Sequence, residues 1–368
     1  MTVKRRDFIA TATVGAGAAA ASTIAAPAIA QSAPEIRWRV ASSFPKSLDT
    51  IYGGAETVAK RVAEMTDGKF QIRVFAAGEI VPGLQVLDAV QAGTVEAGHT
   101  CAYYYVGKDP TFAFDTAMPF GLNSRQQQAW MYQGGGEQLM NEFYKDYNVR
   151  SFVCGNTGTQ MGGWFRNEIK GLNDIKGLKM RIAGIAGQVL AKLGGVPQQI
   201  AGGDIYPALE KGTIDGAEWV GPYDDEKLGF YKVAKFYYYP GWWEGGPAIS
   251  FYANNDKFNE LPKHYQSILQ AATAEANNVM MAKYDVENTL ALRRLVANGV
   301  QLRPYSKEIL EACHKATHEL YDELSKTNPK FAKIYTEWKK FRDDQHLWFR
   351  VAEYTNDSFL YQMSAAKK

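Results

Sequence analysis

A nine-residue pattern that occurs twice is the strongest constraint on the fold. Residues 89–97 read Ala-Val-Gln-Ala-Gly-Thr-Val-Glu-Ala, and residues 208–216 read Ala-Leu-Glu-Lys-Gly-Thr-Ile-Asp-Gly. Each copy contains a helix end, a glycine that stops the helix, and then Thr, a β-branched residue, an acid and a small residue. The repeat predicts one helix-to-strand unit in each half of the chain, as expected of two similar lobes.

Strand and helix patterns alternate around the first copy. Residues 36–41 and 70–75 alternate apolar and polar side chains, which is typical of strands. Helical spacing is present at 50–66 and 83–92, and a strand of small residues follows at 94–100. This order predicts an α/β lobe with a mostly parallel sheet.

Around the second copy, strands are expected at 152–154, 178–183 and 197–200, with a helix at 187–193. We therefore predict an α/β fold in which residues 31–154 form lobe 1 and residues 155–250 form lobe 2. The chain is expected to return to lobe 1 after about residue 250. Helices are then expected at 264–284, 285–296 and 306–325, in a helical part (255–330) that completes the lobes.

The last segment, 331–368, is expected to form a C-terminal helix. From residue 331 to 362 its apolar residues lie mostly three, four or seven apart and form one broad stripe. A helix of about 32 residues is roughly 48 Å long, which exceeds one lobe. The stripe therefore packs on the protein's own core or is covered by a second subunit.

Residues 1–30 have the pattern of an export signal. Residues 4–9 read Lys-Arg-Arg-Asp-Phe-Ile, and a mildly apolar run then ends in Ala28-Ile29-Ala30, a pattern that signal peptidase accepts. The two consecutive arginines and this run are similar to a twin-arginine signal. We predict a mature chain that begins near Gln31 and works in the periplasm. The alternative, a membrane anchor, is opposed by the glycines and the proline within the run.

The composition is that of a soluble globular protein, with 46% hydrophobic and 22% charged residues in 368. Residues 1–30 contain three of the 41 basic residues and one of the 39 acidic residues, so the remainder is balanced. This balance argues against a nucleic-acid partner. The three cysteines, Cys101, Cys154 and Cys313, are expected to be buried thiols, although one disulfide remains open.

Candidate binding residues follow the predicted strands, because ligands of α/β sheets bind beyond the carboxyl ends of strands. Arg181 stands between Met180 and Ile182 in an apolar strand. A guanidinium in that position needs an anion, which is either a ligand carboxylate or a protein acid. Tyr103 follows the first copy of the pattern and offers a ring from lobe 1.

Two carboxylates stand beside tryptophans: Glu218 precedes Trp219, and Glu244 follows Trp243. Each carboxylate needs a cation, hydrogen-bond donors or a proton. A hard cation, Na⁺ or Ca²⁺, held by these carboxylates and an amide oxygen would satisfy both. The loop Asn156-Thr157-Gly158-Thr159-Gln160 can supply that oxygen. The alternative is that the carboxylates pair with Arg or Lys.

Catalytic motifs are not evident. The five histidines show no nucleophile–base pattern, and neither Gly-x-Ser-x-Gly nor a phosphate-binding loop occurs. We therefore expect a binding protein for a small organic acid, without a catalytic cofactor. The competing class is an exported hydrolase or lyase that uses Glu218 or Glu244 as a base.

Several segments together resemble the solute-binding proteins of tripartite ATP-independent periplasmic (TRAP) transporters of the DctP type, and the branch that binds 2-oxo acids in particular. The resemblance covers essentially the whole mature chain. It rests on the twin-arginine start, Phe-Pro-Lys-Ser after the first strand, Gly-Glu-Ile-Val-Pro-Gly at 78–83, Met-Arg at 180–181, the segment 202–218, and Pro-Gly-Trp-Trp-Glu-Gly-Gly-Pro at 240–247.

The resemblance implies a two-lobed periplasmic binding protein fold with a hinge, a cleft between the lobes and a long helix. It implies a pyruvate-like 2-oxo monocarboxylate as ligand, with lactate or another 2-hydroxy acid as the alternative, and a membrane permease as partner. A homodimer through the C-terminal helix is expected. Na⁺, or alternatively Ca²⁺, would bridge ligand and protein. The implied metal ligands are Gln160, Glu218, Trp219 through its carbonyl, and Glu244; the expected ligand contacts are Arg181, Gln160, Asn156, Tyr103, Trp219 and Glu244.

Overall fold

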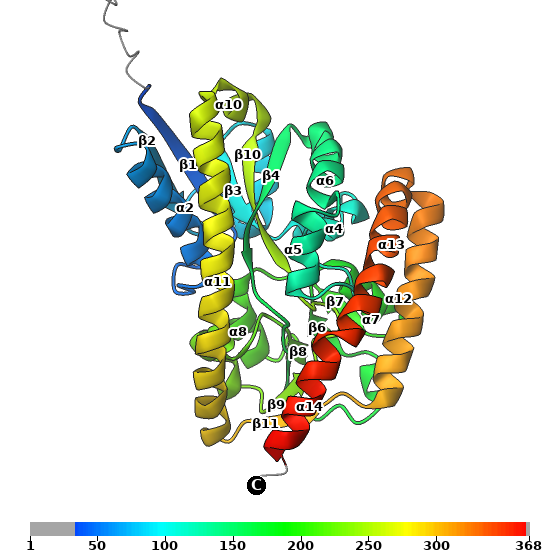
Figure 1. The fold of residues 1–368 in the computed structure, drawn as a ribbon. Coiled ribbons are helices and arrows are strands. Elements are labelled where there is room, and N and C mark those ends of the chain that lie inside the picture. The colour runs from blue at the N-terminus through cyan, green and yellow to red at the C-terminus, as the bar shows by residue number, and fades with distance from the viewer. Residues whose placement is uncertain (1–33, 366–368) are drawn as a thin grey trace, which may run out of the picture. The chain divides into compact units, whose positions relative to one another are not determined.

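The structure is a computed structural model that describes residues 34–365. Its strands form two sheets, and helices pack on both (Figure 1). The predicted export signal at residues 1–30 lies outside the described residues. Within the described range, no helix is long and apolar enough to cross a bilayer.

The first sheet, sheet A, has five strands in the order β2-β1-β3-β10-β4. β1, β2 and β3 are parallel, whereas β10 runs antiparallel between β3 and β4. Sheet A is therefore mostly parallel, as predicted: β4 runs in the direction of β1, β2 and β3, and β10 alone of its five strands runs the other way, because it begins at the end of the sheet where β4 finishes. The strands are β1 (Ile36–Ser42), β2 (Phe70–Phe75), β3 (Ala97–Thr100), β4 (Val149–Asn156) and β10 (Ala248–Asn254).

The second sheet, sheet B, has six short strands in the order β11-β9-β5-β8-β6-β7. They are β5 (Trp164–Phe165), β6 (Lys179–Arg181), β7 (Val196–Gln198), β8 (Gly216–Ala217), β9 (Phe236–Tyr239) and β11 (Gln301–Pro304). The two sheets confirm the predicted α/β fold class. The predicted lobe limits stay predictions, because a sheet is not by itself a separately moving body.

The repeated pattern forms the same local structure twice. It ends α3 (Val86–Gln91) and α8 (Gly202–Glu210), and its glycines, Gly93 and Gly212, both have a φ of +69°. In each copy the amide after the glycine donates a hydrogen bond to the carbonyl of the copy's first residue, at 2.9 and 3.0 Å. This left-handed glycine end is a common helix stop, and it turns the chain into β3 and β8.

The long helix α11 (Lys263–Ala297) links elements of both sheets (Figure 1). The sequence predicted two helices here, 264–284 and 285–296, but the 35 residues form one helix of roughly 52 Å. It packs against β4 of sheet A and against α2 (Ile51–Met65), which lies beside that sheet. It also packs against α9 (Pro222–Leu228), which lies beside sheet B.

The C-terminal segment forms two helices after α12 (Lys307–Thr327) rather than the single helix expected at 331–362. α13 (Pro329–Val351) ends at Ala352, and α14 (Glu353–Ala365) follows. The first part of the predicted apolar stripe is buried, including Trp338, and it packs on Phe114 beside sheet A. The stripe beyond residue 347 is exposed.

The other helices surround the sheets. They are α4 (Ala113–Thr116), α5 (Ser124–Tyr132), α6 (Gly136–Tyr144), α7 (Gly184–Lys192) and α10 (Asn255–Glu260). All three cysteines are buried free thiols, as expected.

Candidate functional site

The strand ends of sheet B bring Arg181 and Glu218 together. β6 and β8 are parallel with Arg181 opposite Ala217, so the next residue of β8's chain, Glu218, lies beside the arginine. Nη1 of Arg181 donates to the Glu218 carboxylate and, at 3.0 Å, to the Glu218 carbonyl. Both side chains are almost fully buried, at 1% and 0% exposed. Of the two partners left open for Arg181, the protein acid therefore occupies Nη1.

Two further contacts hold this pair. Nε of Arg181 donates to the Ile200 carbonyl at 3.1 Å, and the Ala183 amide donates to the Glu218 carboxylate at 3.1 Å. The Arg181 guanidinium also lies 5.1 Å from the centre of the Trp219 ring. The orientation of the guanidinium is thus set by backbone, ring and carboxylate together.

Glu244 reaches the same region from the segment between β9 and β10. Its backbone carbonyl accepts a hydrogen bond from the Gln160 amide at 3.1 Å, and the Gly241 amide donates to the Gln160 carbonyl at 3.0 Å. These bonds hold the loop after β4 against the segment that carries Glu244. The side chains of Glu244 and Gln160 are both buried.

Gln160, Arg181, Glu218 and Glu244 each have one buried side-chain atom without a hydrogen-bond partner among the described residues. These atoms are Gln160 Oε1, Arg181 Nη2, Glu218 Oε2 and Glu244 Oε2. The side-chain nitrogen of Gln160 donates to the Thr157 hydroxyl at 3.2 Å, so the side-chain oxygen of Gln160 faces away from Thr157. Buried polar atoms without partners are rare and costly. The cluster thus presents three oxygens suited to a hard cation and one nitrogen donor suited to an anion.

The electrostatics indicate that the two buried carboxylates need either a proton or a cation. Burial and the charge of Glu218 raise the pKa of Glu244 well above its usual value, and Arg181 and Tyr103 only partly oppose this. Burial also raises the pKa of Glu218, although Arg181 acts in the opposite direction. With both carboxylates ionised and one arginine present, the cluster has an excess negative charge that a bound cation would offset.

Elements of sheet A close the cluster from the other side. Tyr103, in the turn after β3, lies against Gly184 at the start of α7, where a Cβ atom would approach the ring to 2.8 Å. Gly184 therefore permits close contact between the two sheets' elements. Phe44, which follows β1, makes an edge contact with Trp219 at 6.4 Å. A small hollow lies here, lined by Tyr103, Ala117, Pro119, Ala183, Gly184, Ile185, Ala186, Trp243 and Glu244.

Of the predicted site residues, Asn156 differs from the others in its contacts. Its amide nitrogen donates to the Gly246 carbonyl at 2.9 Å, and its oxygen accepts from the Gly158 amide at 2.9 Å. It thus orders the loop that carries Gln160. Its predicted ligand contact, like those of Arg181, Tyr103 and Trp219, stays a prediction.

Sequence reasoning missed Gln199. It follows β7, and its side-chain nitrogen donates to the Tyr104 carbonyl at 2.7 Å, which joins the two sheets' elements. The predicted strand ran from 197 to 200, so the rule that candidates lie beyond the carboxyl end of a strand did not point to Gln199; β7 ends earlier, at Gln198. The amide of Ala183 was missed in the same way, since the predicted strand ran to residue 183 and β6 ends at Arg181.

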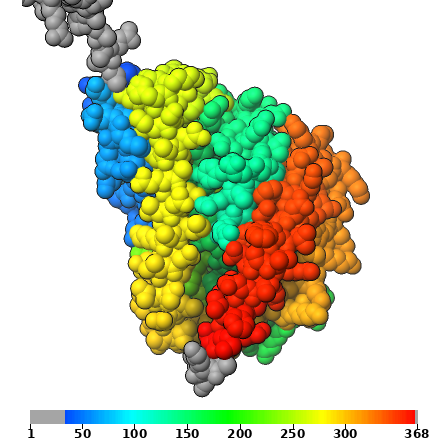
Figure 2. Space-filling view, in the orientation of Figure 1, coloured from blue at the N-terminus to red at the C-terminus, as the bar shows by residue number. Residues whose placement is uncertain are grey.

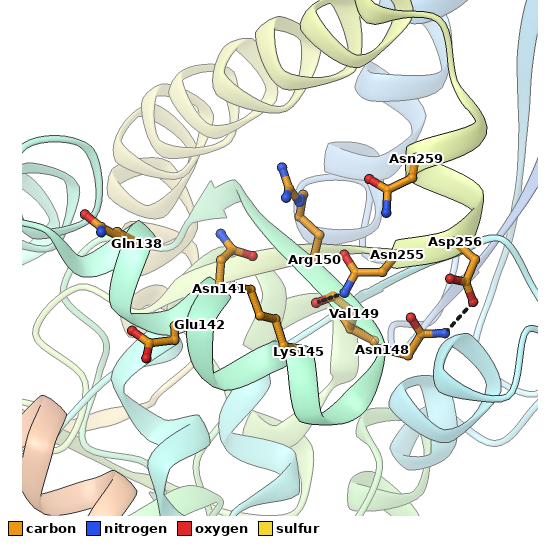
Figure 3. Close-up of a pocket in the computed structure, with 10 residues that line it drawn as sticks. All are labelled: Gln138, Asn141, Glu142, Lys145, Asn148, Val149, Arg150, Asn255, Asp256 and Asn259. Carbon is orange, nitrogen blue, oxygen red and sulfur yellow. Dashed lines mark hydrogen bonds between the residues drawn. The ribbon is translucent and has the colours of Figure 1, made fainter.

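A larger hollow lies at the opposite end of sheet A, where β4 begins and β10 ends (Figure 3). Several of its polar side chains have partners: Asn148 donates to Asp256 at 2.8 Å, and Asn255 donates to the Val149 carbonyl at 3.2 Å. Asn141 is also bonded, to the Ser151 backbone. Because these groups have partners, this open hollow is a weaker candidate for a ligand site than the buried cluster.

Comparison with known proteins finds relatives that match most of the chain. The model of the bacterial extracellular solute-binding proteins, family 7 (DctP), matches residues 41–328. A monocarboxylate 2-oxoacid-binding periplasmic protein of Nostoc sp. is 52% identical over 360 residues, which are 97% of this chain and 99% of the relative.

Two solved structures are also similar. A TRAP transporter solute-binding protein of Bordetella bronchiseptica has 53% identity and a TM-score of 0.90, and the match covers 91% of this chain and 100% of that one. It is a dimer of mixed occupancy, with copurified calcium and picolinate in one active site and an apo site. A TRAP periplasmic solute-binding protein of Pseudoalteromonas atlantica, with bound sodium and pyruvate, has 38% identity and a TM-score of 0.86 over 88% of this chain and 99% of that one.

The match over most of the chain identifies the family, and the cluster of one arginine and two carboxylates agrees with it: the chain belongs to the bacterial extracellular solute-binding proteins of family 7, the DctP-type receptors of TRAP transporters.

Proposed function

We propose that the protein is a periplasmic receptor that binds a small 2-oxo monocarboxylate, such as pyruvate, together with Na⁺ or Ca²⁺ and delivers it to a TRAP permease. The observation that carries this proposal is the buried cluster with one unpartnered guanidinium nitrogen beside three unpartnered oxygens. An anion satisfies the nitrogen, and a cation satisfies the oxygens.

Within this proposal, Arg181 holds the ligand carboxylate through Nη2, while Nη1 remains on Glu218. Glu218, Glu244 and Gln160 hold the cation, with the Trp219 carbonyl as a further ligand. The cation supplies positive charge that offsets the carboxylates and a coordination position for ligand oxygens. Tyr103 covers the ligand from sheet A, and closure of the lobes about a hinge excludes water.

The relatives support this choice of ligand and cation. The Nostoc relative binds monocarboxylate 2-oxo acids, and the Pseudoalteromonas structure contains pyruvate with sodium. The Bordetella structure contains calcium with picolinate, which is also a monocarboxylate. The rival class, an exported hydrolase or lyase, is not favoured, because the family is one of solute receptors. Lactate remains the alternative ligand.

Titration calorimetry tests the proposal. Protein treated with a chelator and held in a choline buffer is titrated with pyruvate, lactate and acetate, each with and without added Na⁺ or Ca²⁺. We expect pyruvate to bind once per chain and only with a cation, and to be recovered unchanged after long incubation. Cation-independent binding would contradict the proposed site, and a preference for lactate would change the ligand to a 2-hydroxy acid.

We further propose that the chain forms a homodimer through its C-terminal helices. Eight of the sixteen exposed large apolar side chains of the described residues lie between positions 347 and 363. Figure 2 shows these helices, in red, uncovered on the face in view. Exposed apolar patches of this kind mark interaction sites, and the similar Bordetella protein is a dimer.

The double substitution Phe359→Glu and Tyr361→Glu in α14 should convert the dimer to a monomer. These side chains are 61% and 72% exposed. Light scattering after gel filtration measures the mass. Val286→Glu is the matched control, since Val286 is 62% exposed on α11, outside the patch. A monomeric wild-type protein, or a dimer that survives the double substitution, would contradict this interface.

A further inference from the structure

An ionic contact at the surface joins the elements of the two sheets. Asp49 lies directly before α2, and its carboxylate pairs with Lys227 of α9. The Tyr223 hydroxyl, also on α9, donates to the same carboxylate at 3.3 Å, and the Lys227 ammonium lies 4.0 Å from the Tyr223 ring centre. A third partner, Lys283 of α11, donates to Asp49 at 2.8 Å.

The partners of Asp49 belong to different parts of the fold. Asp49 precedes α2, which packs on β2 of sheet A. α9 is fixed to sheet B, because Asp225 accepts hydrogen bonds from Trp164 of β5 and Tyr237 of β9, at 2.9 and 2.7 Å. The Asp49–Lys227 contact thus crosses from one sheet's elements to the other's.

Lys283 has a different position. It is on α11, which also packs against α2, and Arg61 of α2 pairs with Glu275 of α11 at 2.8 Å. The Asp49–Lys283 contact therefore joins Asp49 to α11, the helix that packs on elements of both sheets. On the opening expected for a two-lobed receptor, this contact should persist, whereas the contact with Lys227 is the one that crosses between the two sheets' elements and should be weakened.

The crossing contact is close in sequence to the binding cluster. Lys227 is in the helix that begins three residues after Trp219, and Asp49 is five residues after Phe44. Phe44 and Trp219 are themselves in ring contact. The same two segments therefore carry an apolar contact beside the cluster and an ionic contact at the surface.

We propose that Asp49 and Lys227, with Tyr223, form an interlobe clasp that stabilises the closed arrangement and slows ligand release without touching the ligand. The clasp rests on the proposed receptor function. Partial burial opposes ionisation of Asp49, but Lys227 and Lys283 outweigh it and lower the pKa of Asp49, so the carboxylate is charged in the periplasm's ordinary pH range. Asp49 and Lys227 act on ligand release by holding the two lobes in position, and neither contacts the ligand.

A double-substitution cycle tests the clasp. Asp49→Asn and Lys227→Gln should each speed pyruvate release about two- to five-fold, the range of an exposed ion pair. The combined variant should release no faster than the faster single variant, since one contact is lost only once. Stopped-flow tryptophan fluorescence measures release at saturating cation. The effect should fade in 1 M choline chloride, which screens charges without adding Na⁺.

Glu226→Gln is the matched control. Glu226 is the neighbour of Lys227 on α9, and it pairs with Arg294 in the part of α11 beside α9. Its loss removes an ion pair of similar exposure that does not cross between the lobes, so pyruvate release should be unchanged. Equal acceleration in Glu226→Gln and Asp49→Asn, or additive effects in the cycle, would overturn the clasp.

A second measurement separates the clasp from the receptor function. Urea unfolding of the variants, with and without saturating pyruvate and cation, gives the coupling between Asp49 and Lys227 in each state. If wild-type protein binds no pyruvate, the receptor proposal fails, and the coupling in the ligand-free protein alone decides whether Asp49 and Lys227 interact. If it binds pyruvate, the coupling should be larger with ligand, and zero coupling with ligand overturns the clasp.

Discussion

Arg181→Met should abolish pyruvate binding, with a loss of at least about 100-fold in affinity. A charge-assisted hydrogen bond contributes about 1.5–3 kcal/mol, and the ligand carboxylate would lose its partner inside a buried site. The substitution also removes the guanidinium that pairs with the Glu218 carboxylate, although the Ala183 amide still donates to that carboxylate. Titration calorimetry at saturating cation measures the loss.

Two companion variants separate binding from folding. Arg181→Lys keeps the charge but not the fork, so we expect binding weakened about tenfold or more with the fold retained. Arg181→Met combined with Glu218→Gln removes both charges of the buried pair, and replacing both partners is tolerated better than removing one. If this neutral double variant melts near wild type and still binds pyruvate, Arg181 is not the carboxylate anchor.

Local patterns in the sequence predicted much of the fold. Glycine ends of helices depend on neighbours only, so the repeat at 89–97 and 208–216 predicted two helix ends that the structure shows in matching detail. The first three strands of sheet A and part of β4 were also predicted, from local residue patterns. β10 was not predicted as a strand, and its antiparallel direction has no local signal, since strand direction depends on which distant strand is adjacent.

Helix continuity was the other main difference. α11 was expected as two helices, at 264–284 and 285–296, yet it is continuous. The structure explains this, since α11 packs first on elements of sheet A and then on α9. At the C-terminus the error was the reverse: one continuous apolar stripe predicted one helix, but the helix is interrupted at Ala352.

The binding cluster shows where sequence reasoning stops. A charged residue inside an apolar strand drew attention to Arg181, and adjacent tryptophans drew attention to Glu218 and Glu244. The sequence left open whether Arg181 meets a ligand or a protein acid, because pairing depends on strand register. The parallel register of β6 and β8 makes the pair with Glu218, while Nη2 stays available. Contacts between the sheets' elements, such as Gln199 to Tyr104, depend on tertiary structure alone.

Glu244→Gln should have opposite effects on cation binding and on stability. Replacement of groups that merely orient a metal ligand costs about 10- to 100-fold in affinity, so loss of a charged ligand should cost at least about 100-fold. In the absence of cation, however, Glu244 is a buried carboxylate beside the charge of Glu218. Its neutral analogue should therefore raise the free energy of unfolding by about 1–3 kcal/mol.

Thermal melts with chelator and with Ca²⁺ measure both effects at once. Wild-type protein should melt at a higher temperature with Ca²⁺, since a ligand that binds only the folded state stabilises it. Glu244→Gln should melt higher than wild type in chelator and gain little from Ca²⁺. Gln160→Leu keeps both carboxylates and loses one neutral oxygen, so part of the Ca²⁺ effect should remain. A full Ca²⁺ effect in Glu244→Gln would place the cation elsewhere, because a site that needs this carboxylate cannot keep its affinity without the charge.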